Sequence, residues 1–151
     1  MTTYSFLDVQ ASIDGPGGNF QLGSGAGNAE EGITIESTGD KNTMNIGADG
    51  SGMHSLHADS SGTITIRLLK TSTTNAQLQN MFNYQTASSR YHGRNTIVVR
   101  NTITGDVTTC TQVAFAKQPP LTEAKAPGPS EWVFHAISIS KKLGSGTPEL
   151  E

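Results

Sequence analysis

Alternating apolar and polar residues dominate this chain. In GTITIRLLK, Ile64, Ile66 and Leu68 share one face of an extended strand, while Thr63 and Thr65 lie on the other face. The same period of two recurs in six further runs, each bounded by turn residues: SFLDVQASI, GITIES, NTMNIG, NTIVVRNTI, DVTTCTQVAFA and EWVFHAISIS. Seven such runs in 151 residues predict a mainly β protein, an antiparallel β-sandwich or barrel.

One segment has a helical period instead. In TNAQLQNMFNYQTAS, the side chains of Leu78, Met81, Phe82 and Gln85 fall on one face of a helix. We therefore predict one flanking α-helix over about residues 75–87, which packs its apolar side chains onto the sheet.

The stretch GADGSG separates two alternating runs, 42–46 and 63–69. Its glycines supply the left-handed backbone angles that a tight reversal needs. We predict a projecting β-hairpin or loop over about residues 47–62. This segment carries Met53 and Leu56, and a partner surface is expected to cover them because a free loop seldom exposes such side chains together. A disordered surface loop without contacts is the alternative.

The composition favours one domain whose outer surfaces are polar and exposed to water. Apolar residues make up 34% of the chain and charged residues 15%, both low values, and uncharged polar residues that favour strands replace them. Residues 1–143 are expected to form a single β domain, and the polar residues 144–151 a flexible tail. The only cysteine, Cys110, excludes an internal disulfide and is expected to be a half-buried, inert thiol.

The formal net charge of −3 argues against a protein that holds nucleic acid through its phosphates. The charges divide unevenly along the chain. Residues 1–66 contain eight acidic and one basic residue, and residues 67–151 contain nine basic and five acidic residues. Either this uneven division of charge is scatter over a folded surface, or the molecule has opposite poles that suit head-to-tail stacking.

No apolar run is long enough for a membrane span, so we expect a soluble protein without a membrane partner.

Several short motifs resemble catalytic or ligand sites, but none fits one. GPGGNF and GSGAGN lack the lysine of a phosphate-binding loop, and DGSG lacks the alternating oxygen ligands of a calcium loop. His54 and His57 have no suitable third zinc ligand, and Glu30 and Glu31 lie in a glycine-rich turn. We predict no catalytic residues, no metal and no cofactor, and hence a protein that is not an enzyme.

Four segments resemble a known family. YSFLDVQASIDGPGGNFQLGSGAGNAEEGITIE, GADGSGMHSLHADSSGTITIRLLKTS, NAQLQNMFNYQTAS and DVTTCTQVAF are similar to the small tail tube proteins of contractile-tailed bacteriophages. The resemblance covers roughly residues 3–140. It ends beyond Leu143, so nothing is carried over to the tail.

The resemblance implies a structural virion protein that polymerises as stacked hexameric rings into the hollow inner tube of the phage tail. Genome DNA passes through the lumen without specific binding. The implied protein partners are other copies of the chain and the sheath, tape measure, baseplate and tail-terminator proteins. Assembly takes place in the host bacterial cytoplasm, and the mature location is the virion tail.

Two groups of candidate interface residues follow. The projecting loop is expected to contact neighbouring subunits through Asp49, Met53, His54, Leu56 and His57. The polar face of the strands is expected to line the lumen or an intersubunit sheet through Thr63, Thr65, Thr108 and Gln112.

Two alternative functions stay open at this point. The first is the inner tube of a phage-like contractile injection system, which shares fold and assembly. The second is a β-sandwich that binds carbohydrate or acts as an adhesin; it would need exposed aromatic platforms, whereas aromatic residues make up only 6% of the chain and Trp132 lies in an alternating strand. The sequence also leaves open the host, the tube length and which strand faces line the lumen.

Overall fold

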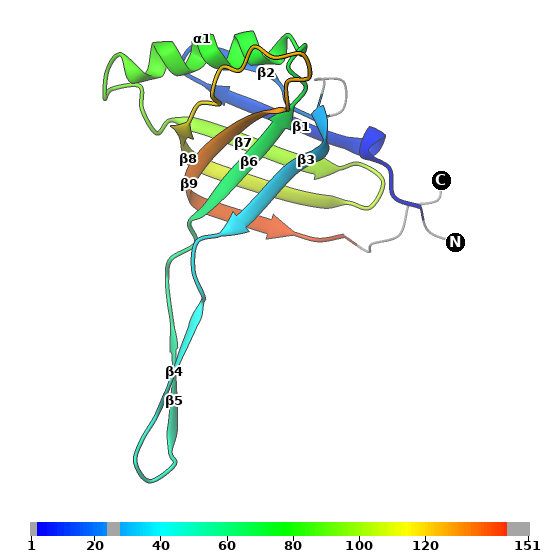
Figure 1. Cartoon of the computed structure of the whole chain (residues 1–151). Coiled ribbons are helices and arrows are strands. Elements are labelled where there is room, and N and C mark those ends of the chain that lie inside the picture. The colour runs from blue at the N-terminus through cyan, green and yellow to red at the C-terminus, as the bar shows by residue number, and fades with distance from the viewer. Residues whose placement is uncertain (1–2, 24–27, 145–151) are drawn as a thin grey trace.

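A computed structural model describes residues 3–23 and 28–144 of the chain (Figure 1). The predicted flexible tail therefore lies outside the described residues from position 145 onward. The elements, in chain order, are η1 (Phe6–Asp8), β1 (Val9–Gly15), β2 (Gly18–Gln21), β3 (Asn28–Ser37), β4 (Asn42–Ile46), β5 (Gly52–Leu56), β6 (Gly62–Leu68), α1 (Thr74–Thr86), β7 (Asn95–Asn101), β8 (Asp106–Lys117) and β9 (Ser130–Lys142).

Seven of the strands form one antiparallel sheet in the order β2-β1-β7-β8-β9-β6-β3. The sheet folds over, so that β3 and β6 cross in front of β7 and β8 in Figure 1. The apolar core includes Ile13, Ile64, Ile97, Trp132 and Phe134, which the two halves of the sheet contribute together. The predicted mainly β fold is confirmed. Its first strand begins later than predicted, because Phe6–Asp8 form a short 3-10 turn.

The sheet is kinked at Gln112 in β8, which has a φ of +52°. The register between β7 and β8 shifts at this point, as it does at a β-bulge. As a result Cys110 and Val113 are both buried, although they are three positions apart in a strand. The inward face of β8 therefore changes from even-numbered to odd-numbered residues at the kink.

The predicted helix is confirmed within one residue of its expected bounds. Helix α1 buries Leu78 and Met81 completely. Phe82 is partly buried and meets the ring of Phe115 edge to face at 5.5 Å. Figure 1 shows α1 at one end of the body, and the hairpin of β4 and β5 projects from the other end.

A buried pair of amides ties this helix to the sheet. Gln85 and Asn95 are both fully buried and exchange two hydrogen bonds of 2.7 and 2.8 Å. Gln85 Nε2 also donates to the carbonyl of Pro16 in the turn between β1 and β2. Three separate segments thus meet at one side chain.

Replacing Gln85 with alanine should lower the free energy of unfolding by about 2 kcal/mol, because it leaves the buried Asn95 amide and the partly buried Pro16 carbonyl without these partners. Urea unfolding measures the loss. Gln77→Ala, on the exposed face of the same helix, is the matched control and should change stability by less than about 0.5 kcal/mol. Equal effects of the two substitutions would contradict this role for Gln85.

Candidate assembly site

The projecting hairpin, here called the arm, spans residues 38–61 and is longer than the predicted 47–62. Its two strands, β4 and β5, pair antiparallel with Met44 opposite His54. The expected boundary is wrong because the run 42–46 is an arm strand. The sheet strands that flank the arm are β3 and β6. Among the described strands, β4 and β5 pair only with each other.

The tip of the arm is a hydrogen-bonded turn. The amide of Gly47 donates to the carbonyl of Ser51, and Gly50 has a φ of +87°. Asp49 Oδ1 accepts hydrogen bonds from the Ser51 hydroxyl and amide, at 2.6 and 3.0 Å. These bonds lower the pKa of the Asp49 carboxyl, the hydroxyl of Ser51 contributing most. Asp49 therefore shapes the tip and keeps a negative charge there.

The arm has one apolar face. Residues directly opposite each other in a hairpin share a face, so Met44, Ile46 and Leu56 lie together on one side. Their exposed fractions are 60%, 60% and 86%. Met53, 58% exposed, lies on the other side. The sequence predicts Met53 and Leu56 as one contact group, but the structure places them on opposite faces of the arm.

Met44 and Ile46 were missed as candidate interface residues. The alternation in NTMNIG predicts a strand that flanks the hairpin, and the structure makes this strand part of the arm. Period-two alternation shows that one face is apolar but does not show what covers that face.

The two arm histidines also lie on opposite faces, because three positions along a strand change the side. His54 Nδ1 is 3.1 Å from Asn42 Nδ2, and His57 Nε2 is hydrogen-bonded to Thr43 Oγ1. The ring of His54 thus joins β4 to β5, and the ring of His57 joins β4 to the segment that follows β5. Within the described residues there is no cluster of three or more His, Cys, Asp or Glu side chains that could hold a metal ion.

The second group of predicted residues is divided between the two faces of the sheet. Thr63 and Thr65 lie opposite the core-facing isoleucines of β6 and are half-buried. Gln112 lines the same outer cavity as Thr63. Thr108 instead pairs with Val99 and faces the open end of the core, so the structure does not bring it together with the others. The kink at Gln112 causes this separation.

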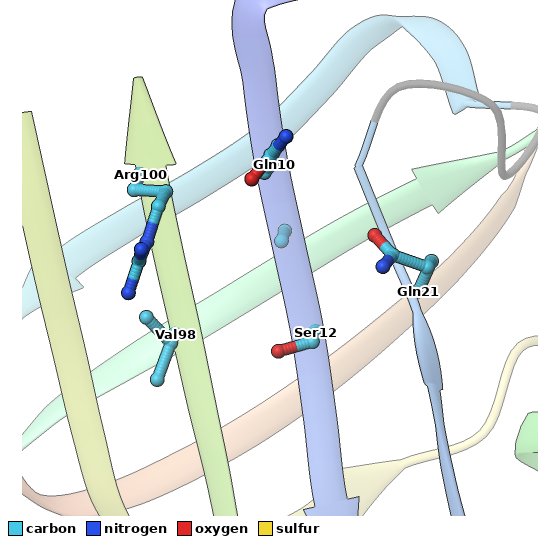
Figure 2. Close-up of a pocket in the computed structure, with 6 residues that line it drawn as sticks. Gln10, Ser12, Gln21, Val98 and Arg100 are labelled. Carbon is cyan, nitrogen blue, oxygen red and sulfur yellow. The ribbon is translucent and has the colours of Figure 1, made fainter. Parts of the chain in front are cut away.

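A further polar surface was not singled out in the sequence. Gln10 and Ser12 of β1, Gln21 of β2 and Arg100 of β7 line a cavity of about 210 Å³. Figure 2 shows these side chains on the three neighbouring strands. These residues alternate with core residues such as Ala11 and Ile97. The alternation in VQASI and NTIVVR is the signal that could have found them.

The remaining reactive group is the Cys110 thiol, which is fully buried. Burial raises its pKa to about 11. We expect a thiol-specific reagent at pH 8 to label Cys110 at least about 100-fold faster in urea than in the folded protein, because the thiolate is the reactive form. Rapid labelling of the folded protein would contradict the placement of Cys110 in the core.

No described helix is long and apolar enough to cross a membrane. The chain is similar in fold to two solved structures. One is the tube-terminating cap of the anti-feeding prophage, with a TM-score of 0.54, 10% sequence identity and 95% of each chain covered. The other is from the baseplate of the same prophage, symmetrised six-fold, with a TM-score of 0.52, 6% identity, and 94% of this chain and 96% of that chain covered. None of the curated proteins matches.

The fold is therefore one found in the tube cap and baseplate of a prophage particle. A family model described as the bacteriophage PhiTE tail tube protein matches residues 1–144, and the chain belongs to this tail tube family. This match confirms the resemblance found in the sequence. Members of the family are structural proteins and not enzymes.

Proposed function

We propose that this chain polymerises as stacked hexameric rings into the hollow inner tube of a contractile phage tail, the conduit for DNA delivery. The observation that carries the proposal is the arm, whose apolar face of Met44, Ile46 and Leu56 is exposed in the single chain. An isolated two-stranded hairpin is marginally stable in water, so a partner must cover this face. In a homopolymer the partner is a second copy.

Membership of the tail tube family supports the tube, and the six-fold symmetrised baseplate with a similar fold supports the number of subunits in a ring. The implied partners are the sheath, tape measure, baseplate and tail-terminator proteins. Assembly in the host cytoplasm and a final place in the virion belong to the same proposal.

The polar outer faces of the sheet suit a water-filled lumen. Thr65 presents an uncharged polar group there. A wall of such residues offers DNA phosphates few cations to bind, so it does not hold the DNA in transit. Thr63 and Gln112 line a cavity and suit the other predicted role, a contact between subunits. Thr108 lies on the inner face at the open end of the core, and this place fits a contact between subunits better than a lumen.

A tube of a phage-like contractile injection system is a second candidate. Both structures with a similar fold come from the anti-feeding prophage, which favours it. The two candidates share the same assembly, and only the cargo of the lumen differs.

Electron microscopy of the purified chain tests the proposal. We expect rings with six-fold averages or hollow filaments, which lengthen as the protein concentration increases. A chain that stays monomeric at every concentration, in both microscopy and sedimentation, would overturn the proposal.

A further inference from the structure

We propose that the cavity at the foot of the arm receives the apolar face of the arm of another copy. This cavity, the foot cavity, has a volume of about 750 Å³ and is lined by Thr63, His92, Gln112, Ala114, His135 and Ile137, among others. The inference rests on the proposed self-assembly and adds the surface on which the arm docks.

The foot cavity has the shape and chemistry of a receiving surface for apolar side chains. The small residues Gly62, Ala114 and Ala136 line it, and Ile137 adds an apolar side chain that is 63% exposed. Its volume falls in the range of about 300–1,000 Å³ that holds ligands much larger than one side chain. It is therefore large enough for several apolar groups of the arm.

The strained backbone of the protein lies in the wall of this cavity. Gln112 is the only described residue other than glycine with a positive φ, a conformation that costs free energy for a residue with a side chain. Its kink separates Gln112 from the regular pleat of β8, on the surface where the cavity opens. Strain of this kind persists where the surrounding structure enforces it, and it is concentrated at sites of function.

The arm of the same chain cannot fill the cavity. It leaves the body at Thr38 and Ser61, which both line the cavity, and projects away from the body in Figure 1. A strand rises about 3.3 Å per residue, so Ile46 lies roughly 26 Å from Thr38 along the arm. The occupant must then be a copy displaced along the arm direction. Because arm face and cavity are different surfaces, each copy can donate one contact and accept another, as in a growing stack.

Charge complementarity favours the same arrangement. The arm tip carries Asp49, whose carboxylate is fully exposed. The loop beside the cavity carries His92 in its lining and the exposed side chains of Arg90 and Arg94. Asp59 also lines the cavity and keeps its negative charge, because its carboxylate accepts a hydrogen bond from the Ser61 amide, but the two arginines of the loop outnumber it. An acidic tip therefore meets a basic loop when the arm docks.

Cross-linking between two single variants tests the docking. Ile46→Cys and Ile137→Cys are mixed under conditions in which the wild type assembles, and a short bismaleimide is added. The native Cys110 is fully buried and gives no background in the folded protein. We expect a cross-linked dimer that contains one copy of each variant, because docking gives the two thiols a high effective concentration.

Met53→Cys is the matched control, since Met53 lies near the tip with nearly the same exposure as Ile46 but on the opposite face. It should cross-link to Ile137→Cys about tenfold less. Assemblies that form normally with equal or absent cross-linking from Ile46→Cys would overturn the docking site and leave the tube proposal standing. Failure of the wild type to assemble would overturn both.

Discussion

A chain in which a short Gly-Ser link replaces residues 42–56 should fold as a stable monomer and form no tubes. The replaced strands pair only with each other, and all ten of their residues lie outside the buried core. Removing them therefore takes no apolar side chain out of the core, and the thermal midpoint of the monomer should barely change. Assembly should stop because the exposed apolar face of the arm is lost. Circular dichroism and electron microscopy measure the two outcomes separately.

Point variants test whether assembly depends on the apolar face of the arm or only on the presence of an arm. Changing Met44, Ile46 and Leu56 together to serine should also prevent tube growth, because the three side chains lie on one face. Met53→Ser changes a side chain of similar exposure on the other face and should still permit it. Normal filaments from the chain without an arm would show that other surfaces drive assembly.

The body of the fold could be predicted from the sequence because its strands repeat a simple pattern. In β6, every second residue from Gly62 to Leu68 is buried, as alternation requires. Helix α1 was predicted for a similar reason, since Leu78 and Met81 are three positions apart and face the sheet together.

The arm could be predicted only in part. Its glycine turn was identifiable, but β4 has the same alternation as a core strand, although all five of its residues are exposed. An arm strand and a core strand differ in the surface that covers their apolar side chains. That surface belongs to another part of the fold or to another subunit of an assembly. A pattern along one chain does not contain this information.

The kink at Gln112 could not be predicted for a different reason. Glycine and asparagine are the residues that commonly take a positive φ, and TTCTQVAF contains neither. Without the kink, Thr108, Cys110 and Gln112 would share one face of β8. With the kink, Cys110 shares its face with Val113, and Gln112 lines the outer cavity. The kink therefore places Thr108 and Gln112 on opposite faces of the sheet, although the alternation in the sequence predicts one face for both.

Gly62→Ala should destabilise the body itself, with a loss of about 3 kcal/mol in the free energy of unfolding, measured in urea. Gly62 is buried at the point where the arm rejoins the sheet, between Ser37 of β3 and Ala136 of β9. A methyl group there would collide with the backbone carbonyl of Glu36 and with the end of the Ile139 side chain. The Ile139 side chain can rotate away, but the carbonyl moves only if β3 separates from β6.

The matched control is Gly39→Ala, at the other side of the foot of the arm. A methyl group on Gly39 would meet no atom within 4 Å, and this residue is exposed. Its effect should stay within about 0.5 kcal/mol, because alanine there neither collides nor leaves a polar group unpaired. A loss of less than about 1 kcal/mol in the free energy of unfolding for Gly62→Ala would contradict the prediction, because it would show that β3 moves away from β6 at the arm junction at little cost. A large loss confined to Gly62 would instead mean that the sheet holds the foot of the arm rigidly, as a docking element that sets the spacing between copies requires.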